Sequence, residues 1–210
     1  MRFSMKNPHM IDRCKMAIAL TVVASVFPVF PVAAGTEPLQ YYEQVLNING
    51  EKHEALVPKG YTLELVTSDL AEPRMLTFGS NGDLFIGSKS HNIYRLSPPY
   101  TKPEILIHLD SYPHSVAFRN NEILIARANG LYRAPYRSGQ KELQAEDVTL
   151  VAALPSSGGH SSRTVAIGPD GRAYISIGIS ANCNKQYLDE SYAFEARRGS
   201  ILVLIEDGKQ

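Results

Sequence analysis

The feature that most constrains the fold is an internal repeat. Three copies follow one another along the chain: "PRMLTFGSNGDLFIGSKSHNIYRL" (73–96), "PHSVAFRNNEILIARANGLYRA" (113–134) and "SRTVAIGPDGRAYISIG" (162–178). Phe78, Phe118 and Ile167 occupy one register, with spacings of 40 and 49 residues. Repeats of this period are typical of arrays in which each unit buries its apolar faces against its neighbours.

Each copy has the composition of short β-strands joined by tight turns. Its β-branched and aromatic runs are separated by "NG", "NN" or "DG", residues that tolerate positive φ in hairpins. Strands are also predicted over 62–70 ("TLELVTSDL") and 104–109 ("EILIHL"). With no long amphipathic helix, the sequence predicts an all-β fold, a β-propeller with about three four-stranded blades.

A propeller of three blades would be incomplete. Propellers close with roughly four to eight blades, and three alone would leave both end faces exposed. Residues 58–210 would then be the N-terminal part of a longer propeller domain. We therefore expect the chain to be a truncation, a fragment or one partner of an assembly.

Residues 1–34 differ from the rest in composition. A cationic start precedes the apolar run "MAIALTVVASVF" (16–27), and "PVAAG" then supplies small residues that suit a signal peptidase. We predict a signal peptide over 1–34 and a periplasmic or secreted protein, with no stable membrane span; an uncleaved anchor is the alternative. Residues 35–57 are predicted to be a polar, irregular leader.

Charge and cysteine content exclude several classes of protein. The chain has 21 Lys and Arg against 21 Asp and Glu, so nothing favours nucleic acid as a partner. Removal of a signal peptide would discard Cys14, leaving Cys183 without a disulfide partner. The histidines show no zinc spacing, and phosphate-binding and hydrolase motifs are absent.

The repeat register aligns three polar residues just before the innermost strands. Arg74, His114 and Arg163 hold equivalent positions in "PRMLTF", "PHSVAF" and "SRTVAI". In a propeller these positions converge at one mouth of the central channel, where Arg suits an anionic ligand because its planar fork pairs two oxygens. The alternative is that they are solvated loop ends.

His160, in "SSGGHSSR", precedes the third inner strand by three residues. It could be a base aimed into a pocket, a metal ligand or a polar turn residue, and its position beside the channel mouth favours the base. Asp170 in "GPDG" is predicted to be an Asx-type turn residue instead of a calcium ligand.

These residues resemble a known family. "GGHSSRTVAIGPDGRAYISIG", followed by "ANCN" and "ARRGSILVL", is similar to the soluble pyrroloquinoline-quinone-dependent sugar dehydrogenases, most of all the sorbosone and pyranose dehydrogenase branch. "VPKGYTLELVTSDLAEPRMLTFGSNGDLFIGS" resembles their opening blade, so the resemblance runs from Pro58 to Asp207. It implies an exported six-bladed propeller, of which residues 58–210 would be the N-terminal half.

The resemblance also implies roles for individual residues. His160 matches the general base that takes a proton from a sugar C1 hydroxyl before hydride passes to the quinone. Arg163, Asn182 and Arg198 fall on the side that faces the cofactor, together with the Arg74 and His114 register positions. The family's calcium ligands, and most of its cofactor cradle, come from later blades outside this chain, which could therefore be inactive alone.

The resulting function is a quinone-dependent oxidoreductase acting on an aldose, related sugar or aldehyde, with a separate electron acceptor. The alternative is an exported propeller that binds a ligand without catalysis. Lactone hydrolysis on a similar propeller ranks last, because the strand starts show no set of carboxylates and asparagines for the calcium site that it needs.

Overall fold

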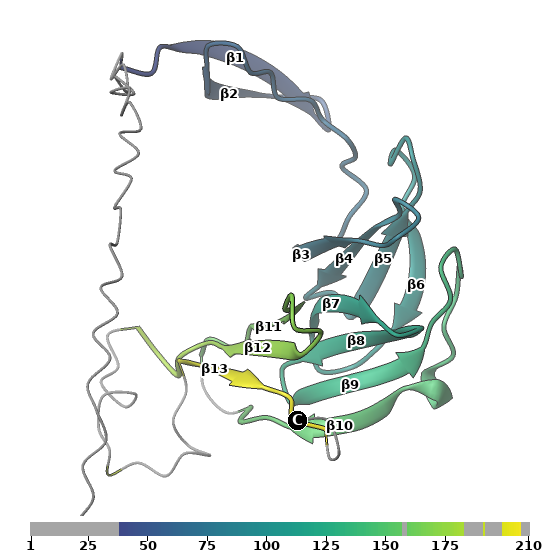
Figure 1. The fold of residues 1–210 in the computed structure, drawn as a ribbon. Helices are drawn as coiled ribbons and strands as arrows, with labels where there is room; N and C mark the ends of the chain where they lie inside the picture. The colour runs from purple at the N-terminus through teal and green to yellow at the C-terminus, as the bar shows by residue number, and fades with distance from the viewer. Residues whose placement is uncertain (1–37, 157–158, 183–190, 192–198, 207–210) are drawn as a thin grey trace, which may run out of the picture. The chain divides into compact units, whose positions relative to one another are not determined.

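The computed structural model describes residues 38–156, 159–182, 191 and 199–206. Apart from a single turn of 3-10 helix, η1 (Ala145–Asp147), every regular element in this part of the chain is a β-strand. The all-β prediction is confirmed. Figure 1 shows the strands grouped into successive antiparallel sheets along the chain. The predicted signal peptide lies outside the described residues.

Three sheets correspond to the three repeat copies, and we call them blades 1, 2 and 3. Blade 1 consists of β3 (Pro73–Phe78), β4 (Leu84–Ser88), β5 (Asn92–Leu96) and β6 (Glu104–His108). Blade 2 consists of β7 (Pro113–Arg119), β8 (Glu122–Arg127), β9 (Gly130–Pro135) and β10 (Thr149–Ala153). Blade 3 contains β11 (Arg163–Ile167), β12 (Ala173–Ile177) and β13 (Ser200–Val203). Each blade adds its strands in sequence order, as the repeat predicts.

The hairpin turns form where the sequence places Asn, Asp and Gly. Between β7 and β8, Asn120 and Asn121 both have positive φ, 48° and 59°, as a two-residue turn requires. The corresponding turn of blade 3 uses Gly171, with φ of 75°. There the backbone N–H of Arg172 donates to Asp170 Oδ1 at 3.0 Å, so the Asx-type role of Asp170 is confirmed.

Blade 2 is apolar on both faces because its second strand, β8, has four consecutive apolar residues. Ile123 and Ile125 face one way and belong to the cluster shared with blade 1. Leu124 and Ala126 face the other way, into the cluster shared with blade 3. All four are fully buried, so the period-2 alternation of one strand joins two cores.

Hydroxyl groups connect the inner strands of neighbouring blades. Thr77 Oγ1 on β3 donates to the carbonyl of Val116 on β7 at 3.0 Å. Ser115 on β7 donates to the carbonyl of Arg163 at 3.0 Å and accepts from the N–H of Val165 at 2.8 Å. These bonds satisfy backbone groups that no sheet ladder reaches, and they set β3, β7 and β11 side by side.

The segment predicted to be an irregular leader instead contains a β-hairpin. Strands β1 (Tyr41–Ile48) and β2 (Glu51–Pro58) pair antiparallel along their whole length. Asn49 and Gly50 form the turn, both with positive φ, 53° and 86°. Asn-Gly between alternating residues is a strong hairpin signal, and the polar composition of the segment concealed it.

The predicted strand over 62–70 was also wrong, because the described chain offers it no partner strand. Its neighbour is the side chain of Gln44, which accepts from the Leu63 N–H at 3.0 Å and donates to the Leu63 carbonyl at 2.6 Å. The segment thus stays extended without joining a sheet. Within the described residues, the structure holds no helix long and apolar enough to cross a membrane.

Candidate functional site

The three aligned residues at the inner-strand starts are joined by a chain of contacts. Arg74 Nε donates to the hydroxyl of Tyr112 at 2.8 Å, and its guanidinium carbon lies 5.9 Å from the centre of that ring. The Tyr112 ring meets the ring of His114 edge to face, with centroids 5.3 Å apart. His114 Nδ1 lies 2.8 Å from the carbonyl oxygen of Arg163. The structure therefore brings Arg74, His114 and Arg163 together at one end of the inner strands.

His114 is a buried, neutral member of this group. A carbonyl oxygen can only accept, so Nδ1 carries the hydrogen bonded to Arg163, and the lone pair lies on Nε2. Burial lowers the pKa of His114; the bond to the Arg163 carbonyl opposes this shift, and the positive charges of Arg74 and Arg163 reinforce it. His114 is thus an acceptor on Nε2 at neutral pH.

Arg163 faces the protein interior instead of the channel mouth. Its side chain is fully buried, and its guanidinium binds the backbone carbonyls of Ser162, at 2.7 Å, and of His160, at 3.3 Å. It also donates to the carbonyl of Pro155. Between β10 and β11, the guanidinium therefore binds backbone carbonyls at Pro155, His160 and Ser162. A sequence pattern places an Arg at a strand start, but it does not show which way the side chain turns.

His160 is exposed and is paired with Asn182. Its Nε2 lies 2.7 Å from Asn182 Oδ1, an atom that can only accept a hydrogen bond. In this arrangement Nε2 carries the hydrogen and the imidazole lone pair lies on Nδ1. An exposed imidazole in this tautomer can accept a proton from a hydroxyl group at Nδ1.

The loop that carries His160 lies directly on the chain that follows β12. The N–H of Gly178 donates to the Ser162 carbonyl at 3.2 Å, and the N–H of Gly159 donates to the Ser180 carbonyl at 2.7 Å. A Cβ atom at position 178 would stand 2.6 Å from the carbonyl oxygen of His160, closer than a real contact permits. Gly178 is therefore required for the loop to approach this closely.

The structure adds Tyr112 to the residues that the repeat register identified. Tyr112 has a positive φ of 54° and links Arg74 to His114, yet it immediately precedes the repeat and was missed. An aromatic residue beside the "PH" start of the second copy was the available signal. Arg198 and Cys183 lie outside the described residues. Among the side chains that the structure describes, no three His, Cys, Asp or Glu residues gather as metal ligands.

Comparisons with solved structures give the same fold. The iodide structure of Trichoderma reesei Carbohydrate-Active Enzymes Family AA12 matches with a TM-score of 0.56 and 19% identity, over 64% of this chain and 36% of that chain. The calcium structure of the same family from that organism matches with a TM-score of 0.51 and 20% identity, over 57% and 33%. An oxidoreductase described as a glucose dehydrogenase, from Thermus thermophilus, matches with a TM-score of 0.51 and 18% identity, over 67% and 46%.

The matched structures are considerably longer than the aligned region. The chain spans about a third of the two Trichoderma reesei structures and just under half of the Thermus thermophilus structure. These likenesses confirm the fold. A family model described as TrAA12-like matches residues 55–197, which include blades 1 and 2, strands β11 and β12 of blade 3, and His160. No curated protein matches the sequence.

Proposed function

The chain belongs to the TrAA12-like family, and on that premise we propose that it carries part of a pyrroloquinoline-quinone-dependent oxidoreductase that oxidises a sugar or related aldehyde. The substrate is a small molecule, and a separate electron acceptor completes the reaction. We also propose export, from the composition of residues 1–34. Recovery of the protein from the cells with residues 1–34 still attached would contradict export.

The observation that carries the proposal is the pair formed by His160 and Asn182. We propose that His160 takes the proton of a substrate hydroxyl at Nδ1. Asn182 accepts the Nε2 hydrogen at 2.7 Å, which holds the ring and selects the tautomer with its lone pair on Nδ1. This role differs from the cofactor contact that the sequence resemblance implied for Asn182. In our proposal Asn182 positions the base.

We propose that Arg163 and Gly178 position the same base through its backbone. The Arg163 guanidinium is bonded to the carbonyls of His160, Ser162 and Pro155, so it holds the backbone next to His160. Gly178 provides the close approach against the His160 carbonyl. We therefore propose that Arg163 acts through His160 and not by contacting a bound cofactor.

The described residues suit a quinone cofactor in part. Pyrroloquinoline quinone carries carboxylates, and Arg74 is an exposed cation at the inner-strand starts, linked through Tyr112 and His114 to the Arg163 backbone. When bound, this quinone would supply the hydride acceptor. Arg74 is the described residue that we propose would hold a carboxylate. The described residues suggest no calcium ligand set, so we assign none.

The test measures quinone binding and turnover separately in the full chain. With pyrroloquinoline quinone and Ca²⁺ added, aldose-dependent dye reduction is expected to fall about 10²–10⁴-fold in His160→Gln, because the base is lost. Quinone binding, followed by absorbance titration, is expected to be unchanged in that variant. Asn182→Ala is expected to lower kcat and to shift the pH profile, because the imidazole tautomer is no longer fixed.

His53→Gln is the matched control, since His53 is an exposed histidine on β2 outside the site. Equal turnover in His160→Gln and wild type would overturn the assigned base. A chain that does not bind the quinone at all would contradict its cofactor dependence and favour the alternative, a propeller that binds a ligand without catalysis. Binding without turnover in the wild-type chain would contradict the activity and leave the binding site established.

A further inference from the structure

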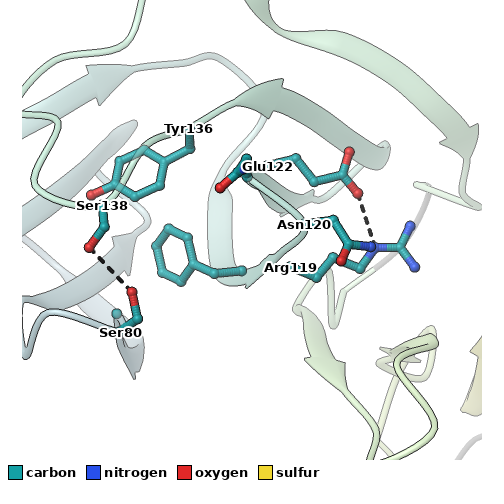
Figure 2. Close-up of a pocket in the computed structure, with 9 residues that line it drawn as sticks. Ser80, Arg119, Asn120, Glu122, Tyr136 and Ser138 are labelled. Atoms are coloured by element: carbon teal, nitrogen blue, oxygen red, sulfur yellow. Dashed lines mark hydrogen bonds and ion pairs between the residues drawn. The ribbon is translucent and has the colours of Figure 1, made fainter.

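A hollow lies between blades 1 and 2 at the opposite end of the inner strands from His160. It encloses about 230 Å³ and is bounded by the β3–β4 turn, the β7–β8 turn and the chain that follows β9. Figure 2 shows Ser80 and Ser138 on one side and Arg119, Asn120 and Glu122 on the other. Because β7 rises about 3.3 Å per residue, this hollow is roughly 16 Å from His114 and belongs to a different face.

Aromatic rings form one part of its lining. The rings of Phe118 and Tyr136 lie with centroids 5.0 Å apart, and Phe85 packs behind Phe118 at 4.6 Å. Phe118 remains partly exposed, whereas Phe85 and Tyr136 are buried. A ring that is supported from behind and partly open in front offers a rigid apolar surface to a ligand.

Polar groups surround these rings. The hydroxyl oxygens of Ser80 and Ser138 lie 3.2 Å apart across the gap between the two blades. On the other side, the side-chain amides of Asn120 and Asn121 make no hydrogen bond with any other described residue. Both residues have positive φ and form the two-residue β7–β8 turn. Hydroxyl and amide groups can each donate and accept.

A second hollow adjoins the first across the same turn. It encloses about 530 Å³ and shares the residues from Asn120 to Glu122 with the first, while its far side includes Glu146, Asp147 and Thr149. The β7–β8 turn therefore stands between two adjoining spaces. A ligand that contacts both must be longer than a single ring.

The charges of this region disfavour anions. Glu122 pairs with Arg119 at 3.0 Å and lies 4.0 Å from Arg133, the one cation lining the second hollow. Arg119 also binds Glu206, so with Glu146 and Asp147 added the described lining of the second hollow is negative on balance. A carboxylate or phosphate ligand would meet these carboxylates and be repelled. A ligand with hydroxyl groups and apolar C–H faces would match both the amides and the Phe118 ring.

We propose that the two hollows bind a neutral oligosaccharide, at a site separate from the His160 site and not involved in catalysis. The first hollow would take one sugar ring against Phe118, with the Ser80 and Ser138 hydroxyls and the Asn120 and Asn121 amides bonding to its hydroxyl groups. The second would take the next part of the same glycan chain. This proposal does not depend on the quinone or on the oxidation of a sugar.

The experiment titrates the full chain, without quinone, with cellotetraose, with maltotetraose and with anionic tetragalacturonate, followed by calorimetry. At least one neutral tetrasaccharide is expected to bind with a Kd of about 1 mM, a modest affinity suited to a shallow polar site. Tetragalacturonate is expected to bind at least about tenfold more weakly, because of the carboxylates. Absence of saturable binding by both neutral sugars overturns the proposal, as does preferential binding of the anion.

Variants locate the site. Ser138→Trp fills the first hollow and is expected to weaken tetrasaccharide binding at least about tenfold. Arg137→Trp is the matched control, because it adds the same bulk at an adjacent exposed residue that does not line either hollow. The double variant Asn120→Gly/Asn121→Gly keeps the positive φ of the turn while removing both amides, and is expected to weaken binding by about threefold to tenfold.

Near-ultraviolet circular dichroism shows whether each variant has kept its native packing. Retained binding in natively packed Ser138→Trp overturns the location of the site. His160→Gln is expected to bind the tetrasaccharides as the wild type does, whereas it removes turnover in the test of the oxidoreductase. The two proposals can therefore fail independently.

Discussion

Blades 1 and 2 begin with inner strands of nearly the same pattern, yet the two strands have opposite environments. Leu76 on β3 is 60% exposed, whereas Val116, at the same register position on β7, is 1% exposed. The difference arises because β7 has β3 on one side and β11 on the other, whereas β3 packs extensively against β7 alone among the described inner strands. The repeat pattern thus specifies a strand and its register, but neighbouring blades determine its burial.

A second pair of equivalent positions, both occupied by arginine, shows the same contrast in burial. Arg95 on β5 and Arg133 on β9 both follow a tyrosine, in "NIYRL" and "GLYRA". Arg95 is buried and holds Asp83 at 2.6 Å, while Arg133 is 55% exposed and 4.0 Å from Glu122. Burial by itself would raise the pKa of Asp83, but hydrogen bonds from Asn81, Ser97 and Arg95, together with the Arg95 charge, lower it.

The largest expected difference between the blades is therefore between Arg95→Ala and Arg133→Ala. Removing Arg95 leaves the Asp83 carboxylate buried without its cation, so the free energy of unfolding is expected to fall by about 3–5 kcal/mol. Arg133→Ala removes a solvated contact and is expected to cost less than about 1 kcal/mol. Urea unfolding of both variants measures the difference, and equal losses would remove the contrast between the two arginines.

The inner strands themselves provide the next comparison. Val116→Ala on β7 is expected to reduce the free energy of unfolding by about 2 kcal/mol, because it removes buried methyl groups and leaves a cavity. Leu76→Ala on β3 deletes more atoms but is expected to cost less than about 0.5 kcal/mol, because that side chain faces solvent. Should Leu76→Ala prove as costly as Val116→Ala in urea unfolding, β3 must be covered in solution.

The smallest expected effect concerns pH. The pKa of folded His114 is lowered from 6.5, so below pH 6.5 the unfolded chain binds more protons than the folded chain. The contribution of His114 to stability is complete above this pH and is lost as the pH falls, by at most about 1.4 kcal/mol per pH unit. Unfolding of His114→Gln between pH 7 and pH 5 is expected to show a smaller slope than the wild type.

Arg74 is the residue of blade 1 at the same register position, and its substitution provides a second test of the His114 prediction. Arg74→Gln removes one of the positive charges that lower the His114 pKa, so it is expected to reduce the same slope by less than His114→Gln does. A slope that is identical in all three proteins would show that His114 titrates in the same way folded and unfolded.

Much of the fold was predictable because turn residues and strand register are local properties. Asn120, Asn121 and Gly171 take positive φ where the sequence predicted hairpins, and the repeat register brought Arg74 and His114 to one end of the inner strands. These predictions needed no knowledge of which surfaces meet. The β1–β2 hairpin was equally local, and its Asn-Gly turn was available in the sequence.

The arrangement of the site was less predictable because it depends on contacts between blades. The inward turn of Arg163, the contact of Tyr112 with His114 and the approach of Gly178 to His160 each arise from groups that meet only after folding. Sequence identified His160 and Asn182 but could not pair them, since the pair spans the β11–β12 hairpin. Residue type and register were accessible from the sequence, whereas side-chain direction was not.

The bonds from Ser115 and His114 to the Arg163 carbonyl have a thermodynamic consequence. They join blade 2 to the first residue of β11, and the Arg163 side chain in turn holds the loop of His160. A ligand that binds only when this loop is ordered must therefore also favour the docking of blade 3 on blade 2, by mass action. Ligand binding and the docking of blade 3 on blade 2 are therefore linked equilibria. A change in one of them can be detected by measuring the other.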